Sequence, residues 1–232
     1  MSSSTDLLAS LRVAVLGGGS VGSTLASKIA DSGLVASVMI AARNPIKTRA
    51  ELAERSLEHL QVGDDINKTL ESSHIIVIAT LGIHEESGIK AFAEALGTLK
   101  DKIVIDATNP LGPFTTGLHI RWEAGTSGGE IMQKYLPEAK VFKAFNTVGV
   151  EHMQEALGKD MLFAGGRLDD LETRSIVEGL IRAVGFKPFY VGPIRYARNL
   201  EAMAELWIHM AVPPLGARKT SRNFWFSISG DP

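Results

Sequence analysis

Short apolar runs alternate along this chain with longer segments whose apolar positions repeat at helical spacing. The runs predict strands, and together they cover residues 11–16, 36–42, 60–62, 74–80, 102–106, 140–145, 161–164 and 187–191. The spaced segments predict helices, and they cover residues 23–32, 48–60, 65–70, 85–99, 129–136, 169–184 and 194–212. This regular alternation is typical of an α/β protein with a doubly wound, mostly parallel sheet.

A glycine-rich turn joins the first predicted strand to the first predicted helix. Residues 17–22 read Gly-Gly-Gly-Ser-Val-Gly, which is the spacing G-x-G-x-x-G inside a strand–helix–strand unit. Gly17 would allow the tight turn, Gly19 would let a pyrophosphate approach the backbone, and Gly22 would let the helix pack close to the strand. The helix N-terminus offers unpaired N–H groups to phosphates. We therefore predict a dinucleotide site, with a glycine turn that binds no ligand as the alternative.

The end of the second predicted strand indicates which dinucleotide is bound. An NAD site carries an acidic residue there for the ribose 2′-hydroxyl, whereas residues 41–44 read Ala-Ala-Arg-Asn. Arg43 can hold a 2′-phosphate with its fork of donors, and Lys47 can add a second positive charge. Both could also be ordinary surface cations. The missing acid and the present base favour NADP(H) over NAD(H).

Three later strands end in small polar residues. Residues 80–82 read Thr-Leu-Gly, residues 107–110 read Ala-Thr-Asn-Pro, and residues 144–147 read Ala-Phe-Asn-Thr. Ligands of doubly wound sheets lie at the carboxyl ends of the strands, so Asn109 and Asn146 could bind a nicotinamide, its ribose or a second substrate. Asparagine and threonine also cap loops and helices, and that alternative stays open.

The other side chains favour hydride transfer to a ring over alcohol chemistry. His84 follows the fourth strand and could contact the second substrate or cap the next helix. No metal-ligand spacing and no nucleophile motif occurs, so we expect no metal site. An alcohol dehydrogenase needs an acid–base residue to move the hydroxyl proton, and none is evident. Transfer to a flavin-like ring needs mainly stacking geometry.

Composition removes several other classes of function. The chain has no cysteine, which excludes disulfides, thiolate nucleophiles and iron–sulfur clusters. Its net charge of −2 gives no reason to expect a nucleic-acid or membrane-surface partner. No apolar run is long enough to span a membrane, and the first residues lack the parts of a signal peptide. A cytoplasmic location is the resulting expectation.

The motifs together resemble those of the NADPH-dependent coenzyme F420 reductase family. The resemblance rests on the glycine turn, Ala-Arg-Asn at residues 42–44, Asp-Ala-Thr-Asn-Pro-Leu at 106–111, Lys-Ala-Phe-Asn-Thr at 143–147 and Leu-Trp-Ile-His at 206–209. The chain is also similar to the cytosolic oxidoreductase domain of the six-transmembrane metalloreductases. The resemblance covers about residues 11–228.

This resemblance implies a Rossmann domain with a small C-terminal α/β extension that ends in a long helix, usually in a homodimer. It implies NADP(H) as cofactor, with coenzyme F420, FMN or FAD as co-substrate. By matching motifs, the residues for the pyrophosphate and the 2′-phosphate would be Ser20, Val21, Arg43, Asn44 and Lys47. The residues around the nicotinamide and the acceptor would be Thr80, Leu81, Asn109 and Asn146, with His84 helping to position the acceptor.

The chain divides accordingly into a flexible tail at residues 1–10, an NADP-binding domain at 11–150 and an extension at 151–232. We expect the extension to complete the sheet, the acceptor site and the dimer contact, and residues 111–128 to form a long loop of a kind that is often functional. Two other functions remain open. One is reduction of a small imine or keto compound, although families with that activity build the substrate site from a larger helical domain. The other is non-enzymatic sensing of NADP(H).

The last predicted helix carries a wide apolar stripe. Its members are Leu200, Met203, Leu206, Trp207 and Met210. Such a stripe either forms a homodimer contact or covers a face of the same subunit's sheet. The family resemblance favours the dimer, whose partner would help to wall the acceptor pocket.

Overall fold

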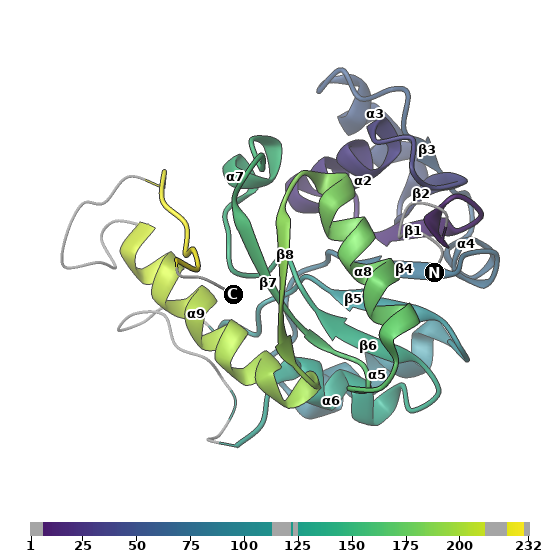
Figure 1. The fold of residues 1–232 in the computed structure, drawn as a ribbon. Coiled ribbons are helices and arrows are strands. Elements are labelled where there is room, and N and C mark those ends of the chain that lie inside the picture. The colour runs from purple at the N-terminus through teal and green to yellow at the C-terminus, as the bar shows by residue number, and fades with distance from the viewer. Residues whose placement is uncertain (1–6, 113–121, 123–124, 212–221, 230–232) are drawn as a thin grey trace.

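The computed structural model describes residues 7–112, 122, 125–211 and 222–229, which form an eight-stranded sheet between two layers of helices (Figure 1). The strand order is β3-β2-β1-β4-β5-β6-β7-β8. The strands are β1 (Arg12–Leu16), β2 (Ser37–Ala41), β3 (Gln61–Val62), β4 (Ile75–Ile78), β5 (Ile103–Asp106), β6 (Lys140–Lys143), β7 (Asp160–Gly165) and β8 (Lys187–Gly192). The predicted doubly wound, mostly parallel sheet is confirmed.

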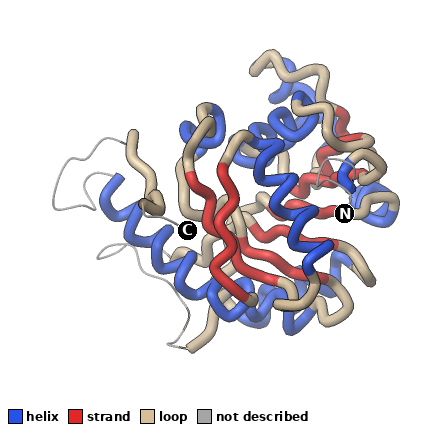
Figure 2. The backbone as a smooth tube through the Cα atoms, viewed as in Figure 1, coloured by secondary structure: helices blue, strands red, loops and turns tan. Residues whose placement is uncertain are grey.

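The helices cover both faces of this sheet (Figure 2). They are α2 (Ser20–Asp31), α3 (Pro45–Ala53), α4 (Ile66–Glu71), α5 (Glu86–Leu96), α6 (Gly128–Tyr135), α7 (Val150–Gln154), α8 (Leu171–Val184) and α9 (Ala197–Ala211). Successive strand residues point to opposite faces, so Val13 and Val15 face the layer of α2, α3, α7 and α8. Ala14 and Leu16 face the layer of α4, α5 and α6.

The last two strands run against the rest of the sheet. All other neighbouring pairs are parallel, but β6 and β7 pair antiparallel, through Phe142 with Gly165 and Lys143 with Ala164. Residues 160–163 of β7 therefore lie beyond the carboxyl end of β6. The short 3₁₀ turn Ile194–Tyr196 leads into α9, which packs on β7 through Leu162, Ala164 and Leu200. The β7–β8 ladder and α9 thus form a wall beside the edge where the other strands end.

Several element boundaries differ from the sequence prediction. The first helix begins at Ser20 rather than at residue 23, so the last three residues of the motif, Ser20, Val21 and Gly22, belong to its first turn. The helix predicted for residues 48–60 ends at Ala53, because Leu57 N–H donates back to Leu52 O and Leu60 turns inward to the core. The short helix α7 was not predicted at all.

The ends of the chain and the long loop are described only in part. The flexible tail predicted for residues 1–10 is wrong at Leu8, whose side chain is fully buried in the core. Residues 1–6 lie outside the described residues, as do 113–121 and 123–124 of the predicted loop at 111–128.

Candidate active site

The glycine turn between β1 and α2 separates glycines that the fold requires from one that it does not. Gly17 has a φ of +118°, and a Cβ there would lie 2.6 Å from the carbonyl oxygen of Ala79. A Cβ on Gly22 would lie 2.0 Å from the carbonyl oxygen of Gly17. A Cβ on Gly19 would meet nothing within 4 Å. Gly17 and Gly22 therefore shape the turn, while Gly19 leaves open space where a pyrophosphate is predicted.

The N-terminus of α2 opens onto that space. Gly19 is its N-cap, no side chain caps it, and no acidic residue lies in its first turn. The N–H groups of Ser20 and Val21 at the start of the helix are therefore free to meet an anion. The side chain of Val21 packs against the core, so any role in binding falls to its backbone.

Arg43 stands exposed just beyond the end of β2. Within the described part of the chain it has no carboxylate partner. Asn44 accepts the N–H of Lys47 at 3.0 Å and so caps α3, while the Lys47 ammonium lies 3.5 Å from Glu51. Arg43 is thus the least engaged of the three predicted 2′-phosphate residues, and Asn44 has a structural task that the sequence prediction did not include.

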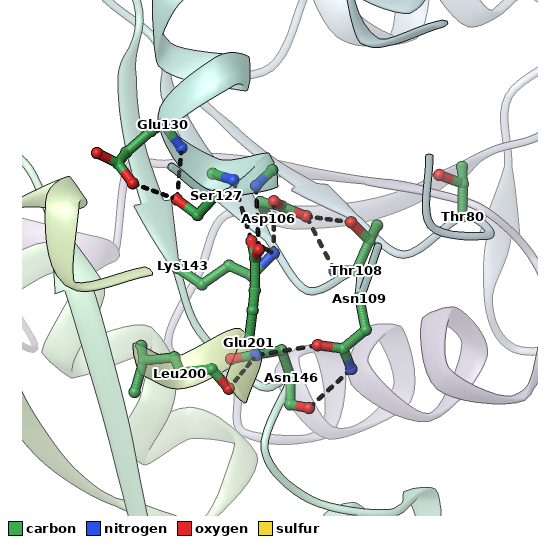
Figure 3. Close-up of polar contacts among 12 residues, drawn as sticks. Thr80, Asp106, Thr108, Asn109, Ser127, Glu130, Lys143, Asn146, Leu200 and Glu201 are labelled. Atoms are coloured by element: carbon green, nitrogen blue, oxygen red, sulfur yellow. Dashed lines mark hydrogen bonds and ion pairs between the residues drawn. The ribbon is translucent and has the colours of Figure 1, made fainter. Parts of the chain in front are cut away.

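Asn109 and Asn146 bind each other, as Figure 3 shows. The side-chain N–H of Asn109 donates to the backbone oxygen of Asn146 at 2.9 Å, and the side-chain N–H of Asn146 donates to Asn109 Oδ1 at 3.0 Å. Asn146 also donates to the carbonyl oxygen of Leu200 in α9 at 3.0 Å. We call these two residues the amide pair.

The two members of the amide pair differ in what they can offer a ligand. Asn146 is 4% exposed, both of its side-chain N–H groups are used, and its Oδ1 is buried without a partner. Asn109 is partly exposed and keeps one side-chain N–H. The predicted contact with a nicotinamide or acceptor therefore fits Asn109, while Asn146 lies behind it as its support.

An unusual backbone conformation precedes Asn146. Phe145 has a φ of +64°, which is rare for a bulky residue, and its ring is 1% exposed in the core against Phe186. Strained conformations of this kind occur mainly where surrounding packing enforces them, often at functional sites. Here the conformation turns the chain between β6 and the amide pair.

Three buried charged residues, Asp106, Lys143 and Glu201, lie close to the amide pair, and we call them the ionic cluster (Figure 3). Lys143 Nζ lies 2.8 Å from Asp106 Oδ2 and 2.9 Å from Glu201 Oε1, and all three side chains are at most 1% exposed. Glu201 also accepts the N–H groups of Gly128 and Gly129 at the start of α6, at 3.0 and 3.1 Å. Burial opposes the charged amine, but the two carboxylates outweigh it and raise the pKa of Lys143 above its usual value.

A pocket lies between the ends of β4 and β5 and the helices α5 and α6. It is lined by Thr80, Leu81, Asp106, Thr108, Gly128 and several apolar side chains. The Thr108 hydroxyl donates to Asp106 Oδ1 at 2.7 Å, which connects the pocket to the ionic cluster. Of the predicted residues, Leu81 is 91% exposed. His84 lies partly buried in the next loop and makes no hydrogen bond within the described chain.

The sequence predicted Asn109 and Asn146 as site residues, but it did not predict the ionic cluster. Lys143 and Glu201 are charged residues inside strongly apolar segments, the end of β6 and the stripe of α9. A charge at a position that the apolar pattern marks as buried must find a partner, and this signal could have suggested the ion pair. No group of metal-binding side chains occurs among the described residues, and none of their helices is long and apolar enough to cross a membrane.

Residues 12–110 are similar to a known protein family. They match the profile of the family described as NADP oxidoreductase coenzyme F420-dependent. Metalloreductase STEAP3 from Rattus norvegicus is 27% identical over 195 residues, which cover 83% of this chain and 36% of that protein. The chain therefore spans little more than a third of this curated relative.

Solved structures extend the similarity over the whole fold. A candidate F420-dependent NADP reductase from Arthrobacter sp. FB24 is 27% identical with a TM-score of 0.75, and the match covers 95% of this chain and 100% of that one. An imine reductase from Aspergillus terreus, solved with NADPH4, is 16% identical with a TM-score of 0.61, covering 85% of this chain and 61% of that one. At that identity the second match concerns the fold alone. The resemblance predicted from the motifs is confirmed.

Proposed function

We propose that this enzyme transfers a hydride between NADP(H) and a ring acceptor, because residues 12–110 match the profile of the coenzyme F420-dependent NADP oxidoreductases. The acceptor would be a deazaflavin of the F420 type or a flavin, FMN or FAD. The similarity to the Arthrobacter protein, which extends over that whole chain, supports the same chemistry beyond residue 110.

The open N-terminus of α2 supports the binding of NADP(H) at this site. Its free N–H groups face the space above Gly19, where a pyrophosphate would gain hydrogen bonds and a favourable helix dipole. Arg43, just beyond the end of the neighbouring strand β2 and without a carboxylate partner among the described residues, would hold the 2′-phosphate. The nicotinamide would then extend toward the ends of β4 and β5, to Thr80, Leu81 and Asn109.

The state of the ionisable residues supports a ring acceptor. Asp106 and Lys143 lie at the ends of β5 and β6, but each is buried and held in the ionic cluster. Neither is free to move the proton of an alcohol or a keto compound as a general acid. A ring acceptor needs chiefly to be stacked against the nicotinamide, and His84, in the loop after β4, would help to position it.

Anaerobic assays with purified protein test the proposal. NADPH would be mixed in turn with coenzyme F420, FMN and FAD, and loss of the reduced-nicotinamide absorbance would be followed. We expect turnover with at least one acceptor, slower turnover with NADH, and none with the Gly19→Val variant.

Two results would overturn the proposal. Oxidation of NADPH by cyclic imines or small keto compounds, and by none of the three ring acceptors, would show the imine or keto reductase instead. Tight NADPH binding without oxidation by any acceptor would indicate a sensor. The spectrum of the purified protein with and without added flavin would show whether a flavin stays bound.

A further inference from the structure

Glu201 is a buried charge that folding alone does not explain. It lies in α9, beyond the cofactor-binding half of the chain, and is 1% exposed. Desolvating a carboxylate is costly, and buried ion pairs can often be replaced by apolar residues without loss of stability. A charged side chain at this position of an otherwise apolar helix face points to a role in fixing the geometry of the residues that it binds.

The same turn of α9 reaches both strand ends of the site. Glu201 holds Lys143, which in turn holds Asp106 at the end of β5. The preceding residue, Leu200, accepts the side-chain N–H of Asn146 through its carbonyl oxygen. Figure 3 shows these contacts beside Thr108 and Asn109. Leu200 and Glu201 are therefore bonded to residues that support Asn109, beside the expected nicotinamide position, and Thr108, which lines the adjoining pocket.

Glu201 also connects this support to the start of α6. Its carboxylate binds the first N–H groups of that helix, at Gly128 and Gly129, and Gly128 lines the pocket. A Cβ on Gly129 would lie 2.9 Å from the Cβ of Ala197, so α6 and α9 approach closely at this point. The carboxylate thus joins β6, α6 and α9 at one position.

We propose that Glu201 is a positioning residue for the nicotinamide end of the cofactor site. Its charge acts on Thr108 through Lys143 and Asp106. By fixing this turn of α9 it also keeps the carbonyl oxygen of Leu200 in place for Asn146, which supports Asn109. This inference rests on the proposed function, because it assumes that NADP(H) places its nicotinamide beside Asn109. The alternative is that Glu201 only joins α9 to the rest of the fold.

A pair of ligands separates these possibilities without any hydride acceptor. Calorimetry would give the dissociation constants of NADPH and of 2′-phospho-ADP-ribose, which lacks the nicotinamide. In the wild type NADPH should bind more tightly, and the difference measures what the ring contributes. In Glu201→Gln, one amide N–H must face Lys143 or the N–H groups of α6. We expect the affinity for NADPH to fall by about three- to tenfold while that for 2′-phospho-ADP-ribose stays unchanged.

Matched variants complete the test. Glu205→Gln makes the same substitution one turn further along α9 at a residue outside the ionic cluster, and it should leave both affinities unchanged. If Glu201→Gln does not fold, Glu201→Asp keeps the charge on a shorter side chain and should show the same selective loss to a smaller degree.

The outcomes distinguish the two proposals. Equal losses for both ligands, or no loss for either, in a folded Glu201 variant would overturn the positioning role. If the wild type instead binds the two ligands equally, the nicotinamide makes no favourable contact beside Asn109. The site assigned under the proposed function would then be wrong.

Discussion

Gly19 and Gly22 lie in one turn of the chain, yet their lack of a side chain serves different ends. Gly19 has open space around it and an extended backbone that any residue adopts, whereas Gly22 lies against the oxygen of Gly17. We therefore expect Gly19→Val to abolish NADPH binding with an unchanged thermal midpoint. Gly22→Ala should lower the free energy of unfolding by about 1–3 kcal/mol, since it overpacks a backbone contact. Calorimetric titration and thermal melts would measure both effects. Retained NADPH affinity in a folded Gly19→Val variant would remove this turn as the phosphate site.

Arg43 offers a second test at the scale of one side chain. Arg43→Glu should weaken NADPH binding by about 1.5–3 kcal/mol, because it removes a charge-assisted phosphate contact and adds repulsion. Binding of NADH, which has no 2′-phosphate, should change far less. Arg55→Glu makes the same charge change at an exposed residue just after α3 and is the control. Equal losses for NADPH and NADH would contradict the assignment of Arg43.

The residues that sequence reasoning could and could not place differ in a physical way. Gly17, Gly19 and Gly22 follow from local spacing, because a turn needs its glycines at fixed intervals. The partnership of Lys143 with Glu201 depends on how a distant helix docks, and the left-handed conformation of Phe145 is enforced by tertiary packing. Neither leaves a local signal beyond a charge or a polar motif among apolar neighbours.

At the scale of elements, the strands were predicted well because continuous apolar runs mark fully buried parallel strands. The helices were less certain at their ends. Leu57 and Leu60 continue the apolar spacing of α3, but they reach the core from turns after the helix has ended. The helix α7 has only five residues, too few to show a period.

The start of α8 carries a pH-dependent contribution to stability. Asp170 caps this helix by accepting the N–H of Thr173, and its Oδ2 lies 2.9 Å from Lys140 Nζ. Burial works against the charged form, but the bonds from Lys140 and Thr173 outweigh it and lower the pKa of Asp170. A lowered pKa in the folded state adds stability above the unfolded value, and that stability is lost as the pH falls through the folded value.

We expect the wild type to be more stable than Asp170→Asn at about pH 6, and the difference to shrink as the pH falls below the ordinary aspartate pKa of about 4. Urea unfolding across this range would measure it. Asp169→Asn is the neighbouring comparison, because Asp169 pairs with Arg167 at the exposed surface, where an ion pair adds little stability. A difference between wild type and Asp170→Asn that stays constant with pH would show that the cap contributes without titrating.

At the scale of the whole molecule, the apolar stripe of α9 is divided between two uses. Leu200 and Trp207 are buried within their own chain, and Trp207 Nε1 donates to the carbonyl oxygen of Phe224 at 2.8 Å. These two residues follow the intramolecular alternative that the sequence left open. Leu206 is 50% exposed and Met203 is partly buried, so the outer part of the stripe remains for the predicted homodimer.

Sedimentation can test that dimer. We expect the wild type to sediment as a dimer and Leu206→Asp to sediment as a monomer with intact NADPH binding, because a charge would be buried at the contact. Leu168→Asp places the same charge on an exposed leucine just before α8 and should leave the dimer unchanged. A wild type that sediments as a monomer well above micromolar concentration would contradict the prediction.

The position of β8 as the last strand has a consequence for solubility. A strand at the edge of a sheet exposes backbone groups that can template aggregation with other chains. β8 begins with Lys187 and Pro188, a charge followed by a residue that has no N–H to offer an incoming strand. These two residues act as gatekeepers for the apolar run Phe189, Tyr190 and Val191 that follows them. Two copies should therefore not pair their sheets edge to edge through β8. Replacing both gatekeepers with threonine should make this edge a site of aggregation.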